Sequence, residues 1–195
     1  TFTLTQGTCK FDGASDNSGL THNFGIFNSN NSNTRTATMG NATVIMSNSG
    51  NSFDFRTSTN CTFQCGTSLI QVVNGAGFLY GSNGGGGTTF YGIKSTGGSF
   101  NFNGTNKWNT NNSPCTNFTI EGNASKTVTV TWDTAQNPLG SISGTLTLTG
   151  NSSVNRLFIV SATFGTLKTI SIGGSCTVTP SNCDFRDIAF STSQD

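Results

Sequence analysis

The chain has 195 residues, a net charge of +1 and 9% charged residues, and its composition is dominated by Gly, Ser, Thr and Asn. Lys and Arg are scattered singly, which argues against nucleic-acid binding. No apolar run reaches the roughly 18 to 20 residues of a membrane helix. Since 16 Phe accompany this near-zero charge, we expect an ordered fold rather than a disordered chain.

Apolar residues recur at a spacing of two, and Gly, Asn or Ser interrupts each run, which predicts an almost all-β chain without helices. In chain order the predicted strands are Thr1–Thr5, Ala42–Met46, Ser52–Arg56, Cys61–Cys65, Leu69–Val73, Phe100–Asn103, Asn117–Glu121, Thr127–Trp132, Gly144–Thr149, Leu157–Ser161, Lys168–Ile172 and Asp184–Phe190.

The spacing of these strands favours a β-solenoid, right-handed and β-helix-like, over a β-sandwich or jelly roll. In the C-terminal half two or three short strands fit each window of about 20 to 25 residues, which is the length of a solenoid turn. Asn-Gly, a common hairpin signal, occurs at 74–75, 83–84 and 103–104 alone, which is too few for a fold built from hairpins. We expect one elongated domain over 1–195, with a loop or sub-boundary at 81–87, where four glycines follow one another.

Threonine fills the outward positions of several predicted strands, most regularly in Gly-Thr-Leu-Thr-Leu-Thr-Gly at 144–150. Thr is the polar residue that best tolerates a strand, and stacked Thr needs no counter-ion. A regular Thr face also orders water and can bind ice. The irregular intervals between the Thr-x-Thr segments favour the structural interpretation.

Four segments carry a resemblance to a known type of protein: Gly-Ile-Phe-Asn-Ser-Asn-Asn-Ser-Asn-Thr-Arg-Thr at 25–36, the segment at 144–150, Phe-Gly-Thr-Leu-Lys-Thr-Ile at 164–170 and Cys-Asp-Phe-Arg-Asp-Ile at 183–188. This succession, from about residue 2 to 190, resembles tail-fibre and appendage proteins of environmental bacteriophages. The resemblance implies β-helix modules and a virion or extracellular setting, and it assigns no active site. The six cysteines and the tetraglycine depart from that pattern.

The cysteines and carboxylates show no clear catalytic or metal pattern. We expect most of the cysteines, at 9, 61, 65, 115, 176 and 183, to be small buried apolar residues. Without a CxxC pair, and with one histidine, His22, no zinc site is expected. Asp12 and Asp16 lack the spacing of a calcium loop. We therefore predict no metal and no cofactor.

Aromatic residues give the candidate binding site. Tyr80 and Tyr91 flank the glycine-rich loop, and Trp108 and Trp132 follow it. Such rings can stack on sugars while a polar edge forms hydrogen bonds. The alternative is that Phe residues fill the core and that Trp108 and Trp132 cap the edge of a turn.

These observations favour a non-enzymatic structural module of a phage virion fibre or appendage that assembles into a trimer or fibre, contacts other virion proteins and binds host-surface glycans. Two alternatives remain. One is a subunit of a bacterial or archaeal extracellular filament. The other is a polysaccharide-degrading β-helix enzyme that uses Asp184, Asp187 or Glu121 as acid or base.

Overall fold

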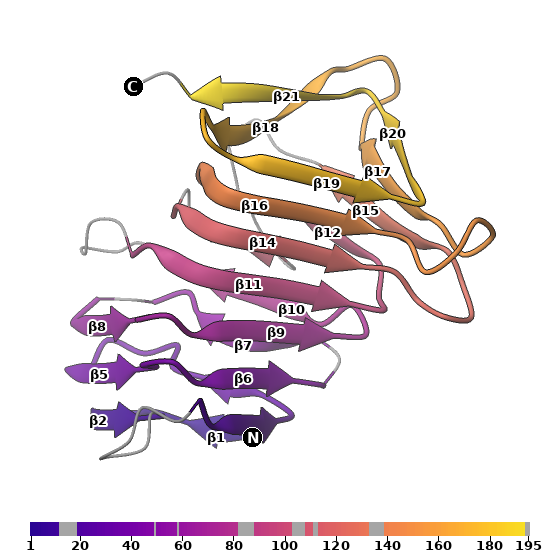
Figure 1. The fold of residues 1–195 in the computed structure, drawn as a ribbon. Coiled ribbons are helices and arrows are strands. Elements are labelled where there is room, and N and C mark those ends of the chain that lie inside the picture. The colour runs from indigo at the N-terminus through magenta and orange to yellow at the C-terminus, as the bar shows by residue number, and fades with distance from the viewer. Residues whose placement is uncertain are drawn as a thin grey trace.

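The computed structural model describes the chain except at 12–18, 49, 58, 82–87, 103–107, 111–112, 133–138 and 194–195. The described residues form no helix, and their strands stack in parallel into a β-solenoid of about six turns, with the termini at opposite ends (Figure 1). The predicted all-β solenoid is confirmed. The sandwich or jelly-roll alternative is wrong, because these folds pair strands in antiparallel fashion and the pairs here are parallel.

The strands form four sheets. Sheet A contains β1 (Phe2–Thr3), β4 (Phe27–Asn28), β7 (Asn51–Phe55), β10 (Gly77–Tyr80) and β13 (Trp108–Asn109). Sheet B contains β2 (Gly7–Lys10), β5 (Arg35–Thr38) and β8 (Cys61–Gln64). Sheet C contains β3 (Thr21–Phe24), β6 (Thr43–Met46), β9 (Leu69–Val73), β11 (Phe90–Thr96), β14 (Cys115–Glu121), β16 (Ile142–Thr149), β18 (Lys168–Gly173), β19 (Thr177–Ser181) and β21 (Ile188–Ser193). Sheet D contains β12 (Phe100–Phe102), β15 (Val128–Trp132), β17 (Leu157–Ser161) and β20 (Cys183–Arg186).

The path of the chain changes along the stack. The first three turns visit sheets A, B and C in that order. From β14 onward the described strands lie in sheets C and D in turn, except that β18 and β19 follow one another in sheet C. Sheet C runs through the whole stack and connects both halves. Most of the predicted boundary at 81–87 lies outside the described residues. The strands on its two sides share sheets, since β10 pairs with β13 and β9 pairs with β11.

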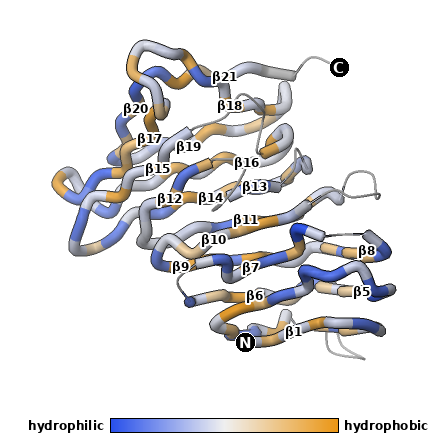
Figure 2. The backbone as a smooth tube through the Cα atoms, turned by 180° about the vertical axis from the view of Figure 1, so that it is seen from behind, coloured by the Kyte–Doolittle hydropathy of each residue, from blue (hydrophilic) through white to orange (hydrophobic). Residues whose placement is uncertain are grey.

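Inward side chains of successive turns stack on one another and form the core. In sheet A the register aligns one aromatic residue from each of five turns, namely Phe2, Phe27, Phe53, Phe78 and Trp108. The ring centroids of Phe53 and Phe78 lie 4.4 Å apart, and Phe100 continues the stack 4.5 Å from Trp108. Seen from behind, hydrophobic and hydrophilic residues alternate along the coils (Figure 2). This alternation is the period-two pattern of the sequence.

Asparagine amides tie neighbouring turns together at the corners between sheets. Asn31 Nδ2 donates to the Leu4 carbonyl, Asn60 Nδ2 to that of Ser32, Asn123 Nδ2 to that of Gly97, Asn155 Nδ2 to that of Ala124 and Asn182 Nδ2 to that of Gly150. Corner carbonyls have no strand partner, so these bonds satisfy groups that would otherwise depend on water. The abundance of Asn thus has a structural role.

The prediction of one continuous strand at Asp184–Phe190 is wrong. The structure divides it into β20 in sheet D and β21 in sheet C. Asp187 lies between them with a φ of 55°, a left-handed conformation that turns the chain from one sheet to the other. Asp and Asn tolerate this conformation better than most residues, and Asn182 makes the preceding corner with a φ of 48°.

Candidate functional site

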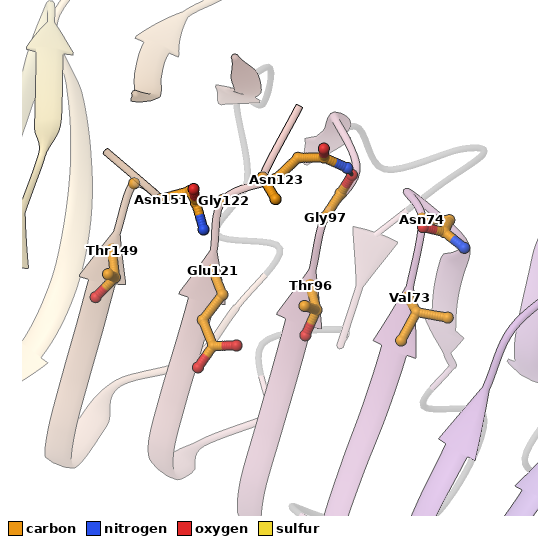
Figure 3. Close-up of a pocket in the computed structure, with 11 residues that line it drawn as sticks. Val73, Asn74, Thr96, Gly97, Glu121, Gly122, Asn123, Thr149 and Asn151 are labelled. Carbon is orange, nitrogen blue, oxygen red and sulfur yellow. Dashed lines mark hydrogen bonds between the residues drawn. The ribbon is translucent and has the colours of Figure 1, made fainter. Parts of the chain in front are cut away.

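A groove of about 620 Å³ runs along the corner where the strands of sheet C end. It crosses four neighbouring strands, β9, β11, β14 and β16. Figure 3 shows their last outward side chains in a row, with the turn residues beyond them. The lining residues are Val73, Asn74, Thr96, Gly97, Glu121, Gly122, Asn123, Ala124, Thr149, Gly150 and Asn151.

The strand register places the groove side chains. Thr96 pairs with Val73 on one side and with Glu121 on the other, and Glu121 pairs with Thr149. The outward position at the end of each strand therefore recurs on four successive turns. Because parallel strands lie 4.7–4.9 Å apart, this row has a fixed spacing.

A charged pair occupies the middle of the row. Lys94 Nζ lies 2.7 Å from Glu121 Oε1, and the two side chains are 25% and 38% exposed. Their opposite charges compensate one another at the surface. The centre of the groove therefore presents the Glu121 carboxylate, whose negative charge is compensated by Lys94.

Several polar groups of the groove are already used by the fold. Thr96 Oγ1 accepts a bond from Gln71 Nε2 at 3.1 Å, and Asn123 donates to the Gly97 carbonyl at 2.7 Å. Among the described residues, the amides of Asn74 and Asn151 and the hydroxyl of Thr149 have no such side-chain bond, and both Asn are exposed. These groups remain able to donate to and accept from a ligand.

A glycine directly follows three of the four strands that the groove crosses. Gly97, Gly122 and Gly150 occupy equivalent positions after β11, β14 and β16. A Cβ at Gly150 would lie 2.2 Å from the Asn182 carbonyl oxygen, so a side chain does not fit there. Gly97 and Gly150 are themselves buried, so glycine at Gly150 serves the close packing of successive turns.

The four aromatic residues predicted to bind a ligand do not come together in this groove. Trp108 and Trp132 are core residues, 0% and 4% exposed, and Trp108 Nε1 donates to the Ala76 carbonyl at 2.9 Å. Tyr80 is 6% exposed, its hydroxyl lies 2.6 Å from Thr88 Oγ1, and burial raises its pKa. These three rings have no free face for stacking on a sugar. Tyr91 is 42% exposed, at the beginning of β11 and away from the groove.

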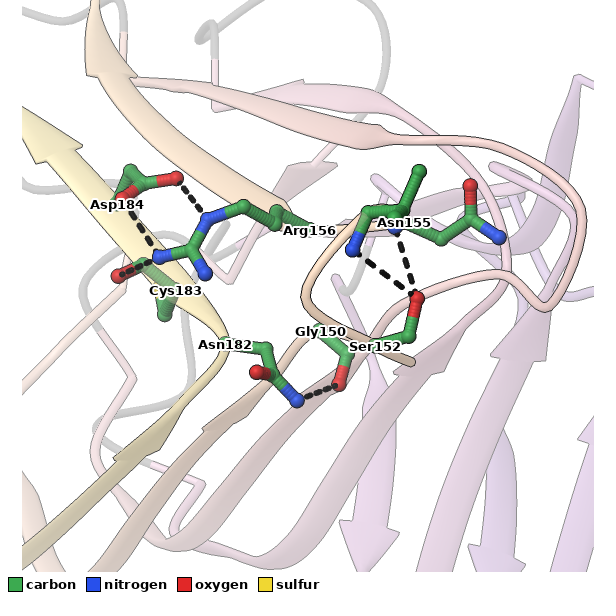
Figure 4. A network of polar contacts seen from close by, with 8 residues as sticks. Gly150, Ser152, Asn155, Arg156, Asn182, Cys183 and Asp184 are labelled. Carbon is green, nitrogen blue, oxygen red and sulfur yellow. Dashed lines mark hydrogen bonds and ion pairs between the residues drawn. The ribbon is translucent and has the colours of Figure 1, made fainter.

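The carboxylates considered for acid–base chemistry have separate structural partners. Arg156 binds Asp184 through Nε–Oδ2 at 2.5 Å and Nη2–Oδ1 at 2.7 Å, at the corner drawn in Figure 4. This hydrogen bonding holds the pKa of Asp184 below its ordinary value. Asp187 Oδ2 accepts a bond from the Gly165 amide at 2.8 Å. Asp12 and Asp16, which were considered for a calcium loop, lie outside the described residues.

The six cysteines form no disulfide. Cys65 and Cys115 are buried, and burial raises the pKa of both thiols, that of Cys115 to about 12. Cys183 is partly buried with a pKa raised to about 11. The expectation of small buried residues thus holds for Cys65 and Cys115, whereas the other four are partly exposed.

The described ranges contain neither a cluster of metal ligands nor a membrane-spanning helix. No group of three or more His, Cys, Asp or Glu residues gathers there in a way that could hold a metal ion. No described helix is long and apolar enough to cross a membrane.

The threonine rows of the sequence fall on different sheets. Thr145, Thr147 and Thr149 align with Thr177, Thr179 and Ser181 on sheet C. Thr36 and Thr38 belong to sheet B, and Thr129 and Thr131 to sheet D. The rows do not make a single lattice, which agrees with the structural interpretation of Thr.

Comparisons with known proteins give no match at any level: no family model, no curated protein and no solved structure is significantly similar to the chain.

Proposed function

We propose that this chain is a non-enzymatic structural module of a virion fibre or comparable extracellular appendage, where it contacts the host surface. The observation that carries the proposal is the continuous column of stacked core residues along the whole stack, enclosed by small hydroxyl and amide side chains. Such a stack makes a stiff rod, because each turn is fixed by its neighbours. The resemblance of the segments at 25–36, 144–150, 164–170 and 183–188 to phage appendage proteins supports the virion setting.

Self-association of the module is supported by its last described turn. Phe185 continues the core column of Ile159, and Phe190 continues that of Ile170. Ile159 and Ile170 are 0% and 3% exposed, whereas Phe185 and Phe190 are 39% and 37% exposed. Among the described residues, no further strand pairs with the outer edges of β20 and β21, and core side chains lie open beside them. Such an edge favours pairing with another chain, and we propose that a second copy covers it.

The proposed location is tested by immunogold electron microscopy with antibodies raised against residues 1–195. The antibodies are applied to phage particles and to cell-surface filaments prepared from cultures in which the gene for this chain is detected. Labelling of phage fibres is expected. Labelling of filaments on uninfected cells would instead support the alternative of an extracellular filament subunit, and labelling of neither would contradict the proposal.

The proposed self-association is tested by sedimentation velocity over a range of concentrations. The chain is expected to form oligomers, and Phe190→Asp is expected to weaken them because it places a charge in the apolar end. Val154→Asp is the control, since Val154 is 79% exposed in the turn before β17 and belongs to no core column. A monomer at every concentration would contradict self-association.

A further inference from the structure

The dimensions of the groove along sheet C suggest the form of its ligand. Asn74 follows β9 and Asn151 follows β16, and these strands are three strand spacings apart. At 4.7–4.9 Å per spacing, the two amides lie about 14 Å apart along the stack. A sugar ring in an extended oligosaccharide advances by a similar length to one strand spacing. A linear glycan parallel to the solenoid axis can therefore place one sugar over each turn.

We propose that this groove binds a neutral, linear oligosaccharide of at least three sugars, held between Asn74 and Asn151 with Glu121 at its centre. The inference deepens the proposed function and rests on it for the biological context. It assigns host-surface contact to the groove rather than to the aromatic residues.

The polar groups of the groove match the chemistry of sugar hydroxyls. A hydroxyl both donates and accepts, and an Asn amide offers two donors and one acceptor. Asn74 and Asn151 provide such amides at the two ends, and Thr149 adds a hydroxyl beside Asn151 at the end of β16. The carboxylate of Glu121 accepts from vicinal hydroxyls. These groups come from three of the four strands that the groove crosses, β9, β14 and β16.

The neutrality of the ligand follows from the charges of the site. Lys94 already compensates Glu121 at 2.7 Å, so the groove offers no excess charge for an acidic or basic sugar. A charged ligand would compete with this pair and lose solvation without gaining a partner.

Affinity is expected to be low for one module. Val73 and Ala124 are the apolar side chains of the groove, and no aromatic ring lines it. Binding through hydrogen bonds that replace bonds to water gives little net free energy. We expect dissociation constants on the order of 1 mM for a trisaccharide. An appendage with many copies would gain strength through multivalency.

The inference is tested by titrating the ¹⁵N-labelled chain with cellotriose, maltotriose and triacetylchitotriose while recording amide chemical shifts. At least one of them is expected to shift the amides of Asn74, Gly97, Gly122 and Asn151 in a saturable manner. Trigalacturonate, which is linear but acidic, is expected to leave these amides unchanged. The absence of saturable shifts with all three neutral probes, or equal shifts with trigalacturonate, would overturn the inference.

A matched pair of variants locates the binding. Thr149→Trp places a large ring in the groove, and Thr145→Trp places the same ring on the same face of β16 outside it. We expect Thr149→Trp to raise the dissociation constant of the glycan at least tenfold. Thr145→Trp is expected to leave the dissociation constant unchanged. If Thr149→Trp fails to fold, Asn151→Ala replaces it, with Asn23→Ala on β3 as its control. Binding that survives in both groove variants would overturn the assignment.

The two proposals fail separately. A chain located on virion fibres that gives no groove shifts contradicts the glycan site alone. A chain that gives the groove shifts but labels no appendage contradicts the structural role alone.

Discussion

The ring of Phe53 stacks on the ring of Phe78 with centroids 4.4 Å apart and planes inclined by 15°. The two residues are register partners on β7 and β10, and both are 0% exposed. The contact joins two turns that lie 25 residues apart in the sequence. Stability of the stack therefore depends on such contacts between turns.

Removing one ring from the aromatic column of sheet A is expected to destabilise the protein strongly. Phe53→Ala removes a buried ring that contacts partners on both sides, so we expect the free energy of unfolding to fall by about 3–5 kcal/mol. Chemical denaturation monitored by circular dichroism measures the change. Phe164→Ala removes an 82% exposed ring and should change stability by less than about 0.5 kcal/mol. Equal losses in both variants would contradict the core assignment.

Replacing the buried Arg35 is expected to loosen the corner between sheets A and B. Its guanidinium donates to Ser29 Oγ at 2.5 Å, to the Ser29, Asn33 and Thr59 carbonyls at 2.6, 2.8 and 3.0 Å, and to the Thr57 carbonyl. Arg35→Met leaves these acceptors without their donor, so we expect a loss of about 3 kcal/mol or more. Urea denaturation measures it.

The control for Arg35 is Lys10→Met, which removes a positive charge from an exposed position on β2. It is expected to have an effect within about 0.5 kcal/mol. A small effect of Arg35→Met would mean that water satisfies the corner carbonyls instead.

Two glycines are expected to respond differently to the same substitution. A Cβ at Gly98 would lie 1.8 Å from the Gly75 amide nitrogen, where backbone of the preceding turn blocks it. At Gly174 a Cβ meets no atom within 4 Å. Gly98→Ala should therefore lower the melting temperature markedly and Gly174→Ala should leave it nearly unchanged. Thermal unfolding checks the pair, and similar melting temperatures would show that the turns do not approach this closely.

Acidification is expected to weaken the Arg156–Asp184 corner. The hydrogen bond from Arg156 lowers the pKa of Asp184 in the folded state below its unfolded value, so the folded carboxyl binds its proton less readily. Its contribution to stability is fully present above the unfolded pKa of about 3.9 and is lost as the pH falls through the folded pKa.

This pH dependence can be isolated by comparing urea midpoints of the wild type and Asp184→Asn between about pH 6 and pH 2. The wild type should lose more of its stability over this range than the variant. Parallel curves would show that Asp184 has an ordinary pKa in the folded protein.

Much of the fold can be predicted from the sequence where apolar alternation is strong. The strand predicted at Leu157–Ser161 is β17, and that at Thr127–Trp132 is β15 within one residue. Polar strands were missed: β5 at Arg35–Thr38 reads Arg-Thr-Ala-Thr, and only pairing with β2 and β8 identifies it. Burial of Arg35 depends on carbonyls of the next turn, which a local pattern cannot reveal.

The groove was harder to predict than the fold because its residues come from four turns. A weak signal exists in the polar-glycine pairs Thr96-Gly97, Glu121-Gly122 and Thr149-Gly150, which recur at intervals of 25 and 28 residues. The aromatic signal was misleading for Trp108 and Trp132. A narrow stacked core accepts large rings, and the sequence does not show which face of a turn they occupy.

The most direct test of the solenoid is the register of sheet C, measured by nuclear Overhauser effects in solution. The account predicts cross-strand contacts of Thr147 on β16 with Thr119 on β14 and with Thr179 on β19, in the pattern of parallel strands. Contacts that instead pair neighbouring strands of the sequence in antiparallel fashion would contradict the stacked turns, the groove and the functions proposed from them.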